Sequence, residues 1–334
     1  MKNLYKMMFT TSMITGTMIA ISSNSWMSMW IGLEINLLSI IPLMSNIKNK
    51  MESEAAMKYF ITQAMASTIF MLSVIMALSK TNLIQTNQMS LMIIDIAILT
   101  KMGAAPFHFW FPEVMEGLSW TNSMIMLTWQ KIAPMTIFSY STKTTIFMVT
   151  VIIMSMMISG LMGINQTSMR KILAYSSINH IGWMIGGMMT NQSIWLIYFT
   201  IYSLMTINIT LMFKQMNISH ITQLINSMNK SKTTKTLFSL NFLSLGGIPP
   251  LVGFYPKWIT INSMIQMNMF LLSLTMIVLT LLSLMFYMRI MFASSIISMP
   301  KSNIKTDKNP SKMIMTNFVI LSALSTCCML INFT

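Results

Sequence analysis

The 334 residues are 54% apolar and only 8% charged, and their mean hydropathy is +0.65. Apolar runs of about 20 residues, the length that crosses a bilayer as a helix, recur along the whole chain. This composition excludes a soluble globular protein, and the lack of strict apolar–polar alternation excludes a membrane β-barrel. The sequence therefore predicts an all-α, polytopic membrane protein.

Methionine is unusually frequent, with 44 copies spread along the chain. Because Met replaces Leu as a flexible apolar side chain, this even spread argues against a Met-based metal site. A genome that reads ATA as Met, as animal mitochondrial genomes do, accounts for it better and indicates an organelle-encoded protein. The two cysteines, Cys327 and Cys328, are adjacent and too few to hold an iron–sulfur cluster.

Apolar runs and their polar interruptions predict about eleven transmembrane helices. In chain order they cover residues 7–22, 26–45, 56–78, 90–112, 120–139, 145–164, 170–189, 192–213, 236–261, 267–289 and 313–332. The first run follows two lysines but has no small-residue cleavage site after it. We therefore expect a first membrane span rather than a signal peptide.

The distribution of basic residues tests this topology. If each helix crosses the membrane once, sixteen of the 21 basic residues gather on the N-terminal side: Lys2, Lys6, Lys48, Lys50, Lys58, Arg170, Lys171, Lys214, Lys230, Lys232, Lys235, Arg289, Lys301, Lys305, Lys308 and Lys312. The opposite side receives only Lys80 and Lys143. The positive-inside rule then places the N-terminus in the matrix or cytoplasm. Orientation accounts for the net charge of +14, so we expect no nucleic-acid partner.

Three basic residues, Lys101, Lys131 and Lys257, are left inside the predicted spans. A charge at the bilayer centre costs about 2.5 to 3.5 kcal/mol on insertion scales. These side chains must therefore be paired, hydrated or neutral, and such residues mark ion or proton pathways.

Two of these lysines adjoin predicted helix breaks. Lys101 precedes a break at 103–106, and Lys257 follows a break at 246–250. Both breaks combine glycine with proline, which removes a backbone donor and interrupts a helix. Broken helices inside a membrane line protein or wet cavities and mark transport sites.

The two breaks lie five spans apart, an odd separation that inverts the second unit relative to the first. The spacing therefore predicts a single membrane domain of two inverted-topology repeats, each with a broken helix. The first half covers about 7–164 and the second about 170–334.

Four carboxylates lie in or near these spans. Glu34 is the one near the centre of a span, where it either neutralises a lysine as a structural partner or tunes that lysine's proton affinity. Asp95 is expected near the far-side mouth of its span, as an entrance residue or as a partner of Lys101. Glu113 and Glu116 are expected at the membrane interface.

Two histidines are candidate pathway residues. His108 follows Lys101 by seven residues, which is the same face only of an unbroken helix, so pathway and structural roles both stay open. His180 lies mid-span among small polar residues and is the best candidate to bridge the two halves, because imidazole can both accept and donate a proton near neutral pH. His220, in a basic loop, is expected to have no specific role.

Signals for redox centres and nucleotide binding are missing. Three scattered histidines do not supply the facing pairs that a membrane cytochrome needs, and the sequence has no glycine-rich nucleotide fingerprint. The chain alone is therefore expected to carry out neither redox chemistry nor nucleotide hydrolysis.

Several segments, in the same order along nearly the whole chain, resemble the mitochondrial NADH dehydrogenase subunit 2 family, the antiporter-like membrane subunits of respiratory complex I. They are Gly32–Asn36, Lys101–Trp110, Trp129–Pro134, Arg170–His180 and Ser244–Trp258. The resemblance implies eleven helices, and proton translocation coupled to quinone reduction elsewhere in the complex.

The resemblance also implies roles for four residues. Glu34 and Lys101 match the family's central glutamate–lysine pair, Lys131 its connecting lysine, and Lys257 the lysine of its second broken helix. The eighth span departs from the pattern of antiporter-like relatives, which often carry an ionisable residue there. Here the polarity of that span is assigned to Tyr202, Thr206 and Asn208, so we expect water to complete the proton relay there.

The same resemblance implies cofactors, partners and location. FMN, iron–sulfur clusters, NADH and ubiquinone belong to other subunits, and none is expected in this chain. Expected partners are the other membrane-arm subunits, including neighbouring antiporter-like ones, and lipids such as cardiolipin. The expected location is the mitochondrial inner membrane, with the N-terminus in the matrix and the C-terminus in the intermembrane space.

Two alternatives to this function stay open at the level of sequence. A stand-alone cation/proton antiporter would share the ancestral fold. A purely structural membrane subunit would carry the buried lysines without using them.

Overall fold

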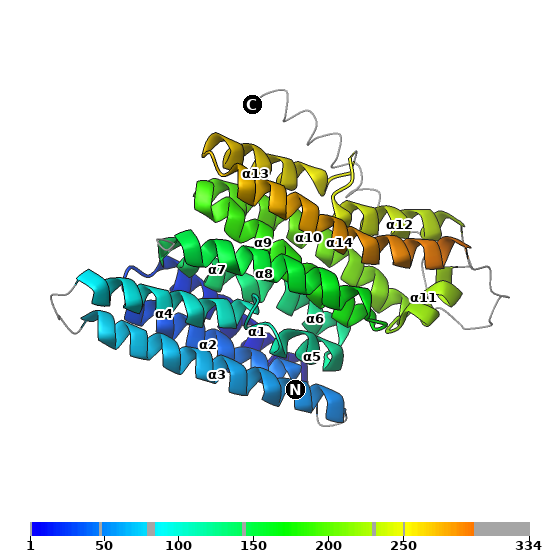
Figure 1. Ribbon diagram of the computed structural model, residues 1–334. Coiled ribbons are helices and arrows are strands. Elements are labelled where there is room, and N and C mark those ends of the chain that lie inside the picture. Colours follow the sequence, from blue (N-terminus) through cyan, green and yellow to red (C-terminus); the bar gives the residue numbers. More distant parts are fainter. Residues whose placement is uncertain are drawn as a thin grey trace. The chain divides into compact units, whose positions relative to one another are not determined.

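The computed structural model describes residues 2–46, 49–78, 84–141, 145–228, 232–249 and 251–296. Within these residues every regular element is an α-helix, and the extended pairing is a single isolated bridge between Ser168 and His220 (Figure 1). The predicted all-α class is confirmed. The last predicted span, 313–332, and Cys327 and Cys328 within it lie outside the described residues.

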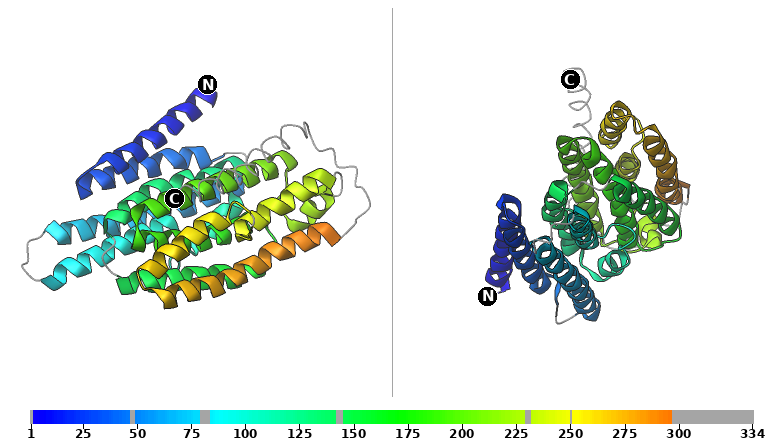
Figure 2. Two further views of the ribbon diagram at one scale, coloured as in Figure 1. Left: turned by 90° about the horizontal axis from the view of Figure 1, so that it is seen from above. Right: turned by 60° about the vertical axis from the view of Figure 1, so that its left-hand side comes forward.

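The chain forms two compact units, Met1–Val151 and Ile152–Thr334, whose boundary lies inside α8. The helices up to this boundary are α1 (Lys2–Ser22), α2 (Trp26–Met44), α3 (Lys50–Leu78), α4 (Ile84–Met102), α5 (Trp110–Gly117), α6 (Trp120–Leu127), α7 (Trp129–Ser141) and α8 (Thr145–Ile164). In the first unit, α1 packs on α2, α3 packs on α4 and α5, and α7 packs on α1 and α4. Figure 2 shows α1 lying along α2 in both views.

The second unit is built around α9. Its helices beyond α8 are α9 (Met169–Thr190), α10 (Gln192–Met216), α11 (Ile221–Met228), α12 (Lys232–Gly246), α13 (Phe254–Gln266) and α14 (Phe270–Ile296). Residues 172–188 of α9 are all buried, so this helix forms the centre of the unit. Helices α10 and α13 pack on α9, and α14 packs on α12 and α13.

Hydroxyl groups along the helices are satisfied by the helix backbone itself. The hydroxyl of Thr17 donates to the carbonyl of Ile14 at 2.8 Å, and that of Ser123 donates to the carbonyl of Trp120 at 2.9 Å. Such bonds to the preceding turn let Ser and Thr lie in an apolar environment without water. The many Ser and Thr residues are therefore compatible with membrane helices.

Among the described residues, five helices are long and apolar enough to cross a membrane: Trp26–Met44, Lys50–Ala77, Ile146–Ile164, Gln192–Met216 and Phe270–Ala293. The count of eleven spans stays a prediction. Several predicted boundaries agree with the helices within three residues, but α3 begins at Lys50 rather than at 56, α4 begins at Ile84 rather than at 90, and α14 ends at Ile296 rather than at 289. Helix α11 lies in the basic loop, where no helix was predicted.

One predicted span is wrong in a further way. The run 120–139 was predicted as one helix, but the structure ends α6 at Leu127 and starts α7 at Trp129. At Thr128 between them the backbone leaves regular helical geometry, with φ −115° and ψ −75°. Apolar residues resume on both sides of Thr128, Gln130 and Lys131, so the hydropathy pattern predicts one span that includes these polar residues rather than an interruption.

Candidate functional site

Helix α4 ends in a glycine cap inside the first unit. Gly103 has a φ of +73°, and its N–H donates to the carbonyl of Thr100 at 3.2 Å. The N–H of Ala104 donates to the carbonyl of Leu99 at 3.1 Å. These two bonds are the Schellman motif, which ends a helix on a left-handed residue and satisfies two of its last carbonyls. Lys101, in the last turn, therefore lies beside the negative end of a helix dipole.

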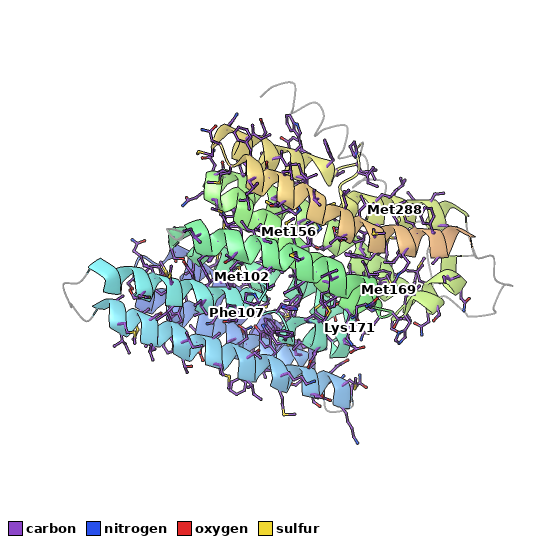
Figure 3. The ribbon with its side chains drawn as sticks, viewed as in Figure 1. Met102, Phe107, Met156, Met169, Lys171 and Met288 are labelled. Carbon is purple, nitrogen blue, oxygen red and sulfur yellow. The ribbon has the colours of Figure 1, made fainter. Side chains whose placement is uncertain are left out.

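The break is longer than predicted. We expected it at 103–106, but the next helix, α5, does not begin until Trp110 (Figure 3, which labels Met102 and Phe107 in this region). Two side chains also bind carbonyls at this end of α4: the indole N–H of Trp110 donates to Thr100, which the Gly103 N–H binds too, at 3.0 Å, and the amide of Gln63 donates to Lys101 at 3.4 Å. The carbonyls of Leu99, Thr100 and Lys101 thus have donors within the chain and need no water.

All three predicted intramembrane lysines are buried. Lys101, Lys131 and Lys257 are 7%, 2% and 6% exposed. Within the described part of the chain, the buried Nζ of Lys101 has no hydrogen-bond partner.

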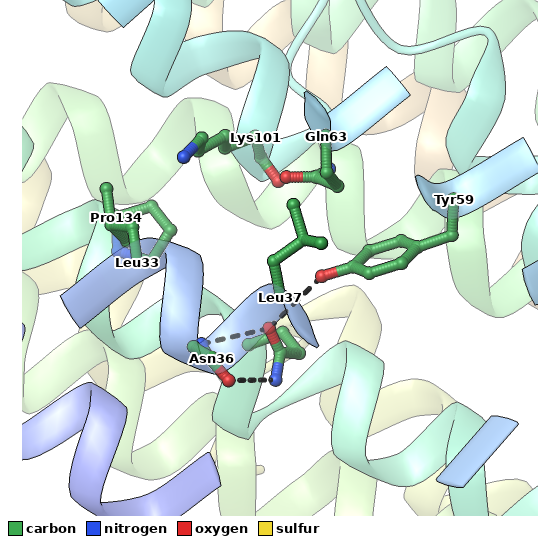
Figure 4. Close-up of a pocket in the computed structure, with 8 residues that line it drawn as sticks. Leu33, Asn36, Leu37, Tyr59, Gln63, Lys101 and Pro134 are labelled. Atoms are coloured by element: carbon green, nitrogen blue, oxygen red, sulfur yellow. Dashed lines mark hydrogen bonds between the residues drawn. The ribbon is translucent and has the colours of Figure 1, made fainter. Parts of the chain in front are cut away.

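Lys101 lines a small polar cavity with an empty volume, open mouth included, of about 280 Å³ (Figure 4). The lining residues are Leu33, Asn36, Leu37, Tyr59, Gln63, Lys101, Gln130 and Pro134. The amides of Asn36 and Gln130 exchange two hydrogen bonds, of 3.1 and 2.9 Å, and the Tyr59 hydroxyl donates to Gln130 at 3.3 Å. The cavity that Lys101 lines therefore has hydrogen-bonded polar walls, and no described residue forms a hydrogen bond with the Lys101 ammonium.

Glu34 and Lys101 are an electrostatic pair rather than a contact pair. The charge of Glu34 acts on Lys101 over a distance, because the two side chains are not among the ion pairs of the described residues. Those ion pairs join Lys58 to Glu54 at 3.0 Å and to Glu113 at 3.1 Å. The buried Oε2 of Glu34 has no hydrogen-bond partner among the described residues. Glu113 lies exposed, in agreement with an interfacial position.

Lys131 lies near the same break. Its Nζ is 5.6 Å from the centre of the Phe111 ring, within the range of a cation–π interaction. A side-chain carbon at Gly103 would lie 3.1 Å from Phe111. Phe111 therefore contacts the break glycine on one side and Lys131 on another.

His108 and Asp95 lie where the sequence did not place them. His108 is in the break itself, buried, with its Nδ1 3.3 Å from the carbonyl of Pro106, so it shares no helix face with Lys101. Asp95 is fully buried and accepts a hydrogen bond from Ser141. Ser141 is therefore one hydrogen-bond partner of this buried carboxylate.

The second unit contains a break with the same cap. Gly247 also has a φ of +73°, its N–H donates to Ser244 at 3.0 Å, and the N–H of Ile248 donates to Leu243 at 3.4 Å. The break was predicted at 246–250, and the structure has it between Gly246, the last residue of α12, and Phe254, the first of α13. Residue 250 lies outside the described residues.

Lys257 completes this second cap. Its Nζ donates to the carbonyl of Gly246 at 2.8 Å and lies 5.8 Å from the Trp183 ring centre. The chain returns close to α12, because a side-chain carbon at Gly253 would lie 1.7 Å from the Ser244 carbonyl oxygen. Only glycine fits there without moving the backbone.

His180 lies in a buried aromatic cluster of the second unit. Its Nδ1 is 2.9 Å from the Tyr198 hydroxyl, and its ring centre is 4.9 Å from that of Tyr202. The polar residues named for the eighth predicted span did not include Tyr198, and the structure adds it as a hydrogen-bond partner of His180. Its position four residues before Tyr202, on the same helix face, was the signal that could have identified it.

The side chains around the two breaks can bind protons. Buried amines, an imidazole and hydroxyls take up or pass protons. Within the described ranges, no group of three or more His, Cys, Asp or Glu gathers as a metal site would require.

Known proteins are similar to the chain over almost its whole length. The model of the NADH:quinone oxidoreductase/Mrp antiporter transmembrane family matches residues 23–283. NADH-ubiquinone oxidoreductase chain 2 of Anopheles gambiae is 45% identical over 332 residues, which cover 97% of each chain.

Two solved structures share the fold at low sequence identity. A chain of respiratory complex I from Thermus thermophilus has a TM-score of 0.85 and 22% identity, covering 96% of this chain and 78% of that one. A chain of the Mrp complex from a Dietzia species has a TM-score of 0.76 and 15% identity, covering 91% and 63%.

Proposed function

The chain belongs to the NADH:quinone oxidoreductase/Mrp antiporter membrane family and is a core membrane subunit of respiratory complex I, and on this basis we propose that its buried lysines translocate protons. In this proposal quinone reduction takes place elsewhere in the complex and drives the proton movement. The chain itself contributes no redox step and holds no cofactor, so FMN, the iron–sulfur clusters, NADH and ubiquinone are bound by other subunits.

One observation carries the proposal: the Lys101 ammonium is buried beside a broken helix and a polar cavity, with no hydrogen-bond partner in the described chain. A proton on this amine is attracted by the end of α4 and by Glu34. A change in that attraction changes how tightly the proton is held, without breaking a hydrogen bond of the amine. Glu34 and Lys101 would together load and release a proton.

We assign the remaining site residues to a relay. Lys131 receives the proton from Lys101, His180 passes it between the halves of the chain, and Lys257 is the acceptor at the second break. His108 is a weaker candidate, because its ring nitrogen is directed to a backbone carbonyl. Both breaks begin with the same glycine cap, and this likeness supports the proposed division into inverted repeats at about 7–164 and 170–334.

We further propose that the chain crosses the mitochondrial inner membrane eleven times, with the N-terminus in the matrix and the C-terminus in the intermembrane space. The bias of basic residues and the Met-rich composition support this topology and location. Its partners would be the neighbouring antiporter-like subunits of the membrane arm and lipids such as cardiolipin.

Replacement of Lys101 by Met tests the proposal, because Met has a similar length but binds no proton. We expect the Lys101→Met complex to assemble, while coupled proton transfer and quinone reduction both fall. The control is Lys214→Met, which removes an exposed lysine at the end of α10. Unchanged pumping by the Lys101→Met complex in liposomes would favour a scaffold role. Recovery of the native chain as a free ion exchanger would favour a stand-alone antiporter.

A further inference from the structure

We propose that Asp95 and Ser141 form a second proton-binding site in the first unit, lying between Lys101 and the compartment opposite the N-terminus. This site rests on the proposed proton translocation and adds a carboxylate that the lysine relay does not include.

The position of the pair follows from how α4 packs on α7. Lys101, near the end of α4, lines the polar cavity together with Pro134, which lies in the first half of α7. Asp95, earlier in α4, bonds to Ser141, the last residue of α7. The two helices therefore run antiparallel. Lys101 follows Asp95 by six positions, which corresponds to about 9 Å along the helix axis.

This geometry places the pair toward one side of the membrane. Helix α4 begins at Ile84, and in the proposed topology the loop before it lies on the side opposite the N-terminus. The last residue of α7 returns the chain to that same side. A proton that leaves Lys101 for that compartment along the α4–α7 interface would reach the Asp95–Ser141 pair on its way.

The pair can hold or release a proton without leaving a buried donor unsatisfied. The ionised carboxylate accepts the hydroxyl hydrogen of Ser141. When a proton binds, the new O–H of Asp95 can donate to Ser141 Oγ. The Ser141 hydrogen can then turn to the carbonyl of Phe138, 3.0 Å away. One O–H bond forms on the carboxylate, one hydroxyl rotates, and the reverse movement releases the proton.

A structural link between α4 and α7 would not require a carboxylate. Asn or Ser could accept the same hydrogen bond, and burying a neutral group costs less than burying an ionisable one. Asp95 is fully buried in a predicted span, where ionisable residues usually serve function. A proton-binding role explains why this position carries Asp rather than a neutral residue.

Asp95→Asn tests the proposal, because Asn keeps the shape and an acceptor oxygen for Ser141 but cannot bind the proton. The complex carrying this variant would be purified and reconstituted in liposomes. We expect normal assembly and normal quinone reduction with an uncoupler, fewer protons pumped per NADH oxidised, and loss of one carboxyl band from the infrared difference spectrum.

Ser141→Ala should keep that infrared band but shift it, because the carboxyl group loses its hydrogen-bond partner. The matched control is Ser159→Ala, another fully buried serine, whose hydroxyl donates to Met156. It should leave both the band and the pumping ratio unchanged. If the Asn variant fails to assemble, Asp95→Glu replaces it. The proposal then requires a shifted band, and an unshifted one overturns it.

The outcomes separate this proposal from the proposed function. Normal pumping with an intact infrared band in Asp95→Asn overturns the second site. If Lys101→Met lowers pumping in the same preparation, the proposed function still stands. Normal pumping in both variants contradicts the proposed function itself.

Discussion

The two broken helices share one backbone motif but use their lysines differently. Both end on a glycine with a φ of +73° and on the same pair of backbone hydrogen bonds. After α12, the ammonium of Lys257 binds the last carbonyl at 2.8 Å. After α4, the amide of Gln63 binds the carbonyl of Lys101, one residue before the last of the helix, at 3.4 Å, and the ammonium of Lys101 has no hydrogen-bond partner in the described chain.

This difference indicates different freedom to change charge. A short hydrogen bond from an ammonium to a carbonyl is charge-assisted and strong, so deprotonation of Lys257 weakens the cap of its own helix. Deprotonation of Lys101 leaves the cap of α4 intact. We infer that Lys101 changes its protonation at low structural cost, whereas Lys257 couples its charge to the geometry of the second break.

The largest expected effect comes from filling the second break. Gly253→Ala places a carbon 1.7 Å from the Ser244 carbonyl, which forces the backbone apart. We expect a loss of more than about 4 kcal/mol of stability, seen as loss of assembled complex on native gels. Gly246→Ala is the matched control, since its added carbon would lie 3.6 Å from Tyr287 in ordinary contact. Equal assembly of the two variants would contradict this account of the break.

A smaller effect should separate the two lysines. Lys257→Met leaves the buried carbonyl of Gly246 without its donor, at a cost of about 1 to 3 kcal/mol. Lys101→Met removes an ammonium that no described residue binds by a hydrogen bond, so we expect no loss of stability at the first break. Hydrogen exchange of peptides that span each break measures both effects. We expect faster exchange around 240–257 in the first variant and unchanged exchange around 95–110 in the second.

The opposite result would reverse the comparison. Faster exchange at the first break in Lys101→Met, with none at the second in Lys257→Met, would mean that Lys101 is the structural lysine. Activity adds an independent readout. We expect Lys101→Met to impair pumping in a complex of normal stability, and Lys257→Met to impair both.

The sequence could predict the breaks because their signals are local. Gly103 and Gly247 with the prolines nearby interrupt otherwise apolar runs, and lysines stand out in them. It could not predict where each break ends, because the start of α5 and α13 depends on packing against other helices. The interruption at Thr128 lies beside the polar Gln130 and Lys131 but has no glycine to mark a helix end, so it was not predicted.

The sequence could not predict which side chains of different helices are in contact. Glu34 and Lys101 were matched as a pair by resemblance, but no spacing rule gives a distance between α2 and α4, and the structure has them out of direct contact. The burial of Asp95 depends on α7 covering it. Tyr198, in contrast, was predictable from the sequence, because it lies four residues before Tyr202 and therefore on the same helix face.

The smallest expected effect concerns the cap of α4 itself. Gln63→Met removes a neutral donor at 3.4 Å, a longer bond than that of Lys257, so we expect a cost of roughly 0.5 to 1.5 kcal/mol. Hydrogen exchange of peptides around 95–110 should rise modestly, by less than Lys257→Met raises exchange around 240–257. Gln266→Met, at the exposed end of α13, is the control and should change neither region. A larger effect of Gln63→Met than of Lys257→Met would show that the neutral amide, not the ammonium, is the stronger cap. The two breaks would then differ in the reverse sense, with the geometry of the first one more tightly fixed.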